Sequence, residues 1–159
     1  MKSLLKISGG LKVKITSSAF EHNTMIPSKY TCEGRNINPP LSIKDIPAGA
    51  KSLALIVDDP DAPMKTWVHW TAWNINPDIS EIAENSIPEG CIEGTTSSGR
   101  TGYGGPCPPS GTHRYFFKLF ALDAMLDLKP GAYIADLTAV MKEHIIDKDE
   151  FIGLYKKKN

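Results

Sequence analysis

The chain has 159 residues, of which 41% are hydrophobic and 23% are charged, a composition typical of one globular domain over residues 1–159. Lys plus Arg and Asp plus Glu each number 18, so the chain has no net positive charge with which to bind nucleic acid or an anionic membrane. No run reaches the ~20 apolar residues of a membrane-spanning helix, and residues 1–10 lack the apolar core of a signal peptide. We therefore expect a cytoplasmic protein without integral membrane association.

Five segments have the pattern of β-strands. Residues 11–16 alternate apolar and polar side chains, which is the period of a half-buried strand. Residues 53–57 are apolar throughout, so we expect this strand to be covered on both faces. Residues 67–75 and 115–122 are rich in aromatic and other strand-forming side chains, and residues 151–155 form a last candidate strand.

One helix is predicted near the C-terminus, where apolar positions recur with the spacing of a helix face: Leu137, Val140, Met141, His144 and Ile145. The connections between the strands, above all residues 94–111, are rich in Gly, Ser and Pro. Many strands joined by such turns, with one late helix, favour a mainly β antiparallel sandwich over a doubly wound α/β fold.

The segment DDPDAP, residues 58–63, follows a predicted buried strand with three carboxylates and two prolines. An aspartyl nucleophile would need Mg²⁺ and a parallel sheet, and a divalent-metal site would need a spaced set of oxygen ligands. The sequence has neither pattern, so we predict no metal and no cofactor. A turn built from Asp and Pro, or part of an anion-binding pocket, both stay open.

The chain has three cysteines, Cys32, Cys91 and Cys107. An odd number in a chain of this size indicates reduced thiols in a cytosolic protein. A pair between Cys32 and Cys107 stays open, because both lie in loops rich in Gly and Pro.

Three segments occur in a particular order: VDDPDAP at residues 57–63, WVHW at 67–70 and GGPCPPSGTHRY at 104–115. Together they resemble the phosphatidylethanolamine-binding protein (PEBP) family, in particular its bacterial and archaeal branch of Raf-kinase-inhibitor-like proteins. The segments KYTCEG at 29–34 and NPPLS at 38–42 add to the resemblance, which covers nearly the whole chain.

The resemblance implies an antiparallel β-sandwich with a few peripheral helices, including one near the C-terminus, and a small anion pocket at one end. It also implies a cis peptide bond before Pro63. Carried over by motif, the ligand-binding residues are Asp59, His69, Pro106, Gly111, His113 and Tyr115. The residues that support this pocket are Asp61, Pro63 and Arg114.

The chemistry of these residues agrees with such a pocket. His113 and Tyr115 are two apart on a predicted strand, so they point to the same face. Imidazole N–H, phenol O–H and backbone N–H groups are suitable donors to a phosphate oxygen. Asp59 can orient a histidine or accept a proton from a monoprotonated phosphate. Arg100 is interpreted as a surface charge rather than an anion-steering residue.

We therefore predict that the protein binds phosphate or a phosphorylated headgroup resembling phosphoethanolamine, and that it modulates signalling or other proteins. The alternative is a weak phosphoester or ester hydrolase, with His69 or His113 as acid–base group and Asp59 as its orienting partner. No nucleophile is evident, which favours binding over catalysis. The resemblance further implies a homodimer and leaves a kinase-type protein partner open.

Overall fold

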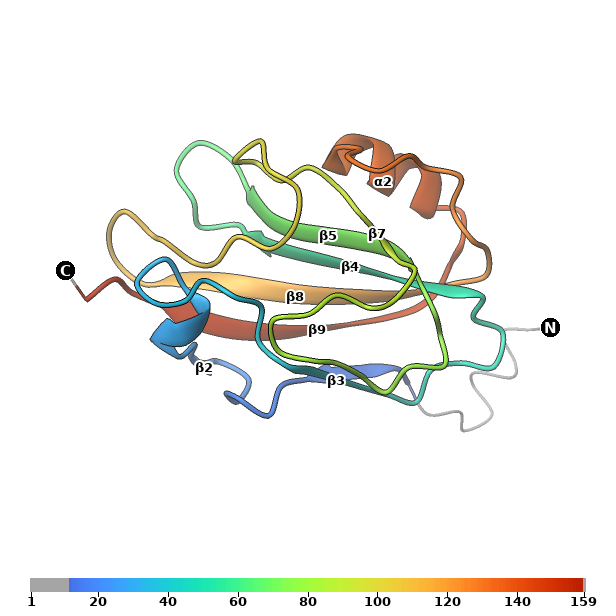
Figure 1. Cartoon of the computed structure of the whole chain (residues 1–159), viewed down its shortest axis with the longest axis horizontal. Helices are drawn as coiled ribbons and strands as arrows, with labels where there is room; N and C mark the ends of the chain where they lie inside the picture. The colour runs from blue at the N-terminus through green and yellow to red at the C-terminus, as the bar shows by residue number, and fades with distance from the viewer. Residues whose placement is uncertain (1–11, 159) are drawn as a thin grey trace.

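In the computed structural model, which describes residues 12–158, two β-sheets pack face to face (Figure 1). Residues 1–10, which the signal-peptide prediction concerns, and Leu11 of the first predicted strand lie outside the described residues. The strands are β1 (Lys14–Thr16), β2 (Thr24–Met25), β3 (Leu41–Lys44), β4 (Ser52–Asp59), β5 (Trp67–Ile75), β6 (Glu81–Ile82), β7 (Ile92–Glu93), β8 (His113–Leu122) and β9 (Ile145–Tyr155). The helices are the 3₁₀-helix η1 (Ser28–Tyr30) and the α-helix α2 (Ile134–Met141).

The larger sheet has six strands in the order β2-β9-β8-β4-β5-β7, and the smaller sheet has the order β1-β3-β6. Neighbouring strands are antiparallel except for β2 and β9, which are parallel. The predicted mainly β sandwich with a late helix is therefore confirmed. Since β4, β5 and β8 are neighbours, their ends at Asp59, Trp67 and His113 lie together at one end of the sandwich.

Strand β4 is buried on both faces, as its continuous apolar sequence predicts. Leu55 packs between the two sheets in the same core as Ile15 of β1. Ile56 points to the opposite face, where it packs with Leu137 and Met141 of α2. Burying each such side chain contributes roughly 1.5–3 kcal/mol, so the strand that ends at Asp59 is held firmly from both sides.

The predicted helix is shorter than its apolar stripe. Helix α2 ends at Met141, and the backbone N–H of His144 donates to the carbonyl of Met141 at 2.9 Å to close a turn. Ile145 then begins β9 and pairs with Leu122 of β8. Sheet pairing with β8 therefore outweighs the helical spacing of the last two stripe residues, and extending the helix through His144 and Ile145 was wrong.

Strand β9 begins six residues earlier than the predicted strand at residues 151–155, because its charged first half also belongs to the sheet. The carboxylates of Asp147 and Asp149 accept hydrogen bonds from the backbone N–H groups of Val13 and Ile15, each at 2.9 Å. These acidic side chains thus hold the β1 segment against β9, a role that alternation of polarity does not reveal.

The cis peptide bond expected before Pro63 is not present, and residues 12–158 contain no cis peptide bond at all. The chain reverses by another route. Met64 has a φ of 76°, and the backbone N–H of Lys65 donates to the carbonyl of Pro63 at 2.9 Å. This tight three-residue turn changes the chain direction with the proline peptide in the trans form.

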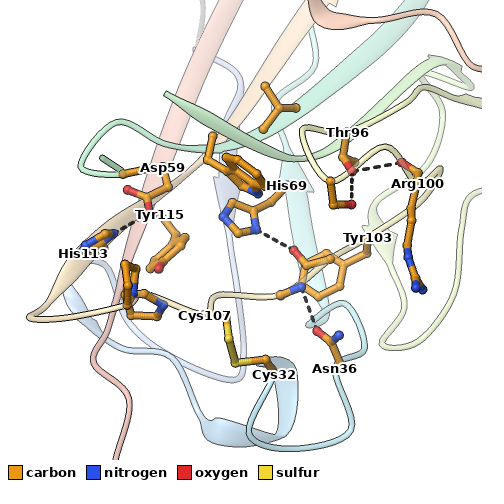
Figure 2. A pocket seen from close by; sticks show the side chains of 18 of the residues that line it. Cys32, Asn36, Asp59, His69, Thr96, Arg100, Tyr103, Cys107, His113 and Tyr115 are labelled. Carbon is orange, nitrogen blue, oxygen red and sulfur yellow. Dashed lines mark hydrogen bonds and ion pairs between the residues drawn. A yellow bond between two sulfur atoms is a disulfide. The ribbon is translucent and has the colours of Figure 1, made fainter. Parts of the chain in front are cut away.

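Cys32 and Cys107 form a disulfide, so the expectation of reduced thiols is wrong for these two residues (Figure 2). Their loops are already joined by a hydrogen bond from the backbone N–H of Cys32 to the carbonyl of Pro106, at 3.1 Å. The resulting Cα–Cα distance of 5.5 Å lies within the normal range for a disulfide. Cys91 is a free, half-buried thiol.

Candidate functional site

The DDPDAP segment forms a turn that fixes the carboxylate of Asp59 at the end of β4. Asp59 is buried, and its Oδ1 accepts the backbone N–H of Asp61 at 2.7 Å. This is the local hydrogen bond by which Asp commonly closes a turn. The other oxygen, Oδ2, is left to face β8.

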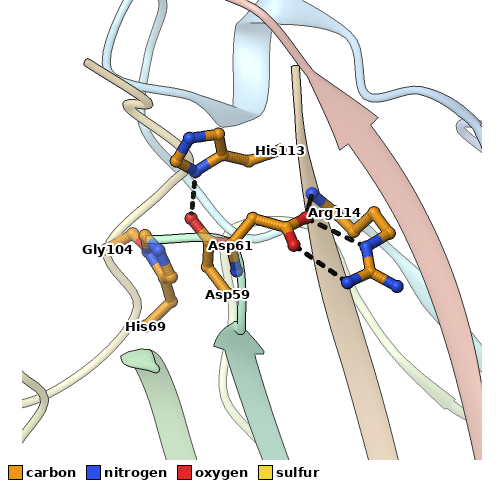
Figure 3. A network of polar contacts seen from close by, with 6 residues as sticks. All are labelled: Asp59, Asp61, His69, Gly104, His113 and Arg114. Atoms are coloured by element: carbon orange, nitrogen blue, oxygen red, sulfur yellow. Dashed lines mark hydrogen bonds and ion pairs between the residues drawn. The ribbon is translucent and has the colours of Figure 1, made fainter. Parts of the chain in front are cut away.

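Asp61 joins the turn to β8 through Arg114 (Figure 3). Its carboxylate accepts the backbone N–H and Nε of Arg114, both at 2.9 Å, and Nη2 at 2.8 Å. These hydrogen bonds to the guanidinium hold the pKa of Asp61 at about 2 and raise the pKa of Arg114. The pair lies outside the cavity, so its contribution is to position the turn.

The remaining carboxylate of the segment, Asp58, points away from the turn because successive strand residues face opposite sides. It accepts a hydrogen bond from Nζ of Lys118 on β8, at 2.9 Å. Burial raises its pKa, and the ammonium group opposes that shift. Only one of the three carboxylates therefore reaches the candidate site.

His113 and Tyr115 lie on the same face of β8, as their spacing predicts. His113 Nδ1 donates to Asp59 Oδ2 at 2.7 Å, and both side chains are buried. The ring of His113 stacks on that of Tyr115 with centroids 6.4 Å apart. The hydroxyl of Tyr115 is buried near the Asp59 carboxylate and the backbone of Cys107, but it makes no hydrogen bond of normal geometry with a described residue. Burial, together with the nearby charge of Asp59, raises the pKa of Tyr115, so this hydroxyl keeps its proton.

His69 reaches the same site from β5. Its Nδ1 lies 2.8 Å from the carbonyl oxygen of Gly104, and since a carbonyl can only accept, Nδ1 carries the hydrogen. Burial lowers the pKa of His69, which favours the neutral ring. Its edge packs against Tyr115 with centroids 5.3 Å apart. In the neutral tautomer that results, Nε2 is an acceptor.

These side chains line a cavity of about 700 Å³. The predicted residues Asp59, His69, His113 and Tyr115 are brought together there, along with Pro63 of the turn. Pro106 and Gly111 do not line it. Pro106 is buried behind the wall, and Gly111 is exposed with a φ of 70°, so it shapes the loop before β8.

Several lining residues were not predicted from the sequence, or were given no role in the site: Cys32, Asn36, Met64, Trp67, Thr96, Ser98, Arg100 and Tyr103. Most belong to loops without a periodic pattern. The one sequence signal that could have indicated this part of the site is the concentration of polar residues at 95–101. In the structure an isolated bridge pairs Thr95 with Thr101 and closes this segment into a loop. Trp70, the residue after His69, is fully buried and does not line the cavity, and its Nε1–H donates to Glu93 at 2.7 Å.

The loop before β8 is tied to η1 and to the loop after it by two further hydrogen bonds in addition to the disulfide. Gly105 N–H donates to Asn36 Oδ1 at 2.8 Å, and Tyr103 Oη donates to the carbonyl of Tyr30 at 2.7 Å. The disulfide from Cys32 to Cys107 is the covalent link. Two loops far apart in the sequence thus form one continuous wall of the cavity (Figure 2).

In the described part of the chain, no three or more His, Cys, Asp or Glu side chains are grouped so that they could hold a metal ion. In the same part, no helix is long and apolar enough to cross a membrane. The arrangement instead combines a carboxylate–imidazole pair, a second imidazole and a phenol in a half-open cavity, which is a constellation suited to binding a small polar ligand.

Comparison with known proteins identifies the class of protein that carries this sandwich and cavity. A model of the phosphatidylethanolamine-binding protein family matches residues 16–156, and the chain belongs to this family. A UPF0098 protein of Methanothermobacter thermautotrophicus is 50% identical over 150 residues, covering 91% of this chain and 99% of the relative. A UPF0098 protein of Pyrococcus horikoshii is 49% identical, covering 96% of this chain and 82% of the relative.

Solved structures agree with this membership. A PEBP homologue from Chlamydia trachomatis superposes with a TM-score of 0.89 at 41% identity, covering 92% of this chain and 99% of that one. YbcL of Escherichia coli, described as a member of the mammalian PEBP family, superposes with a TM-score of 0.87 at 29% identity, covering 93% and 100%. Family membership indicates ligand binding in general and leaves the ligand to be argued from the cavity.

Proposed function

We propose that the protein binds a small, partly protonated oxyanion, such as phosphate or a phosphorylated headgroup, in the cavity beside Asp59 and His113. The observation that carries the proposal is the hydroxyl of Tyr115, which is buried in the cavity wall near the Asp59 carboxylate and the backbone of Cys107 but makes no hydrogen bond of normal geometry with a described residue. An unsatisfied buried polar group costs about 1–3 kcal/mol. A ligand oxygen placed beside it would remove that cost.

Donors and acceptors in the cavity favour a ligand that has both kinds of group. Tyr115 Oη donates, whereas neutral His69 accepts at Nε2 because Nδ1–H is engaged with Gly104. Asp59 already accepts from His113 and from the backbone of Asp61. A monoprotonated phosphate offers acceptor oxygens for the tyrosine and an O–H for the histidine. A fully ionised anion offers acceptors alone.

The substitution Tyr115→Phe tests the proposal, because it removes the hydroxyl and keeps the ring. We expect calorimetric titration with phosphate and phosphoethanolamine to show weak binding by the unaltered protein and about 5- to 10-fold weaker binding by the variant. The free energy of unfolding is expected to stay the same or to rise, since the unsatisfied hydroxyl is gone. Tyr133→Phe, at an exposed tyrosine beside α2, is the control and leaves both quantities unchanged.

Unchanged phosphate affinity in the Tyr115→Phe variant, or no phosphate binding by the unaltered protein, would contradict the proposal. The same samples address the hydrolase alternative. Turnover of a phosphate ester that His69→Ala abolishes would favour catalysis. Cys107 cannot serve as a free nucleophile while it is joined to Cys32, which is a further reason to favour binding.

Modulation of signalling or of another protein, a homodimer and a cytoplasmic location stay predictions. Occupancy of the cavity would support a modulating role if it altered the joined loops that form the cavity wall. Those loops lie at the molecular surface, where a partner could contact them.

A further inference from the structure

Arg100 is the residue of the cavity that the proposed function leaves without a role. Of the lining residues in the described part of the chain, Arg100 alone carries a permanent positive charge. The only lining carboxylate among the described residues is Asp59, which is paired with His113. A bound phosphate therefore meets no lasting positive charge at the buried end of the cavity.

Arg100 also has no acidic partner, unlike other cations near the site. Arg114 is engaged with Asp61, and Lys118 with Asp58. No ion pair involves Arg100 among residues 12–158. Its guanidinium is therefore available to an anionic ligand, and its five N–H donors suit a carboxylate or phosphate group.

The backbone at Arg100 is firmly placed, although its side chain is exposed. The carbonyl of Arg100 accepts both the N–H and the Oγ1 of Thr96, at 2.8 and 3.0 Å. Ser97 joins this small loop to β5. Its backbone N–H donates to the carbonyl of Val68 at 3.0 Å, and its side-chain Oγ accepts a hydrogen bond from the Val68 N–H at 2.8 Å. Val68 directly precedes His69, so the loop is held in place beside the buried end of the site.

The cavity is wide enough to separate two ligand groups. Figure 2 shows Arg100 on the opposite side of the cavity from Asp59 and His113. A volume of about 700 Å³ is in the range of sites that take small organic molecules, and a phosphate ion beside Tyr115 would fill only a small part of it.

We infer that Arg100 forms a second anion subsite, so that the ligand class is phosphate monoesters that carry a further acidic group, either carboxylate or phosphate. The first phosphate lies beside Asp59, His69 and Tyr115, and the second group pairs with the Arg100 guanidinium at the outer side of the cavity. This inference rests on the proposed function, because it presumes that the buried end holds a phosphate.

Phosphoethanolamine and phosphoserine test the inference, because the second differs from the first by one carboxylate. We expect the unaltered protein to bind phosphoserine about 3- to 10-fold more tightly than phosphoethanolamine in calorimetric titrations, a range set by the partial exposure of Arg100. In the Arg100→Gln variant the ratio of the two affinities falls to about one, while affinity for inorganic phosphate changes less than about twofold. Arg100→Lys keeps part of the preference.

Lys51→Gln is the matched control, because it removes one exposed positive charge at the opposite end of β4 and should leave the ratio unchanged. The inference is overturned if the unaltered protein does not prefer phosphoserine, or if the preference survives in Arg100→Gln. It is also overturned if Arg100→Gln weakens inorganic phosphate as much as phosphoserine, since Arg100 would then bind the first phosphate. Absence of any phosphate binding would instead defeat the proposed function itself.

Discussion

At the scale of single residues, one backbone carbonyl decides which nitrogen of His69 is left for a ligand. The carbonyl oxygen of Gly104 accepts a hydrogen bond from Nδ1–H of His69, and burial lowers the pKa of the ring below its ordinary value of 6.5. In the unfolded chain the ring takes up a proton near that ordinary value, but in the folded chain it does so only at lower pH. The contribution of His69 to stability is thus present above pH 6.5 and is lost as the pH falls toward the folded pKa.

The same neutral ring predicts how binding depends on pH. A phosphate monoester loses its last proton near pH ~6, so the form that can donate to Nε2 becomes about tenfold scarcer for each pH unit well above that value. We expect affinity for phosphoethanolamine to fall as the pH rises from about 6 to 8. Calorimetric titration in two buffers that differ in ionisation enthalpy measures both the affinity and the protons exchanged.

Sulfate is the control ligand for this pH dependence, because it carries no proton in the same range. Its binding should be weaker and should lack the loss of affinity caused by deprotonation of the ligand. Tighter binding of phosphoethanolamine at pH 8 than at pH 6 would show that the fully ionised ester is the bound form, contrary to the acceptor role of His69.

How far single residues could be predicted from the sequence depends on whether a period governs them. His113 and Tyr115 are two apart on a strand, so their common face follows from strand geometry alone. The proximity of Asp59 and His69 follows once β4, β5 and β8 are neighbours. The place of Arg100 in the cavity does not follow, because its loop is closed by hydrogen bonds of Thr96 to Arg100 itself and is fixed on β5 by those between Ser97 and Val68.

At the scale of elements, the loop before β8 is defined by how closely its backbone approaches the loop after η1. A Cβ atom added at Gly105 would lie 2.3 Å from the carbonyl oxygen of Tyr30 and 2.5 Å from Asn36 Oδ1. A Cβ at the adjacent Gly104 would have its nearest contact at 3.9 Å, with the carbonyl oxygen of His69. There is therefore room for a side chain at Gly104 but not at the neighbouring Gly105.

This contrast predicts that two alanine substitutions differ in their effect on stability. Gly105→Ala should lower the free energy of unfolding by about 1–3 kcal/mol, because backbone atoms on both sides must move. Gly104→Ala, the matched control, should change it by less than about 0.5 kcal/mol. Urea unfolding followed by tryptophan fluorescence measures both values. Equal effects of the two substitutions would mean that the loops are not packed as closely as the structure shows.

Elements show a second limit of prediction from sequence. The strand at β4 and the aromatic strand β8 are evident from composition, since both lie in the centre of the larger sheet. The first half of β9 is not evident, because its acidic residues resemble an exposed loop. Asp147 and Asp149 belong to the strand because their backbone pairs with β8, and their side chains also accept hydrogen bonds from the N–H groups of Val13 and Ile15, more than a hundred residues away.

At the scale of the whole molecule, the disulfide joins parts of the chain that are 75 residues apart and encloses β3 to β7 in one covalent loop. This pairing was left open by the sequence, since an odd cysteine count favours reduced thiols and only the fold brings Cys32 beside Cys107. It also removes the thiol argument for a cytoplasmic location, because disulfides persist mainly in oxidising compartments.

A loop of this length predicts a substantial contribution to stability. Replacing both cysteines, as Cys32→Ser with Cys107→Ser, should lower the free energy of unfolding by about 2–4 kcal/mol, because the unfolded chain regains the freedom that the cross-link removes. Dithiothreitol should produce a similar loss in the unaltered protein and none in the double variant, and urea unfolding with and without the reductant measures both. Cys91→Ala is the control, since burial raises the pKa of this free thiol to about 11 and the variant should keep the full response to reductant. An unaltered protein whose unfolding midpoint does not respond to dithiothreitol, and in which three free thiols can be titrated, would show that the bridge is absent in solution.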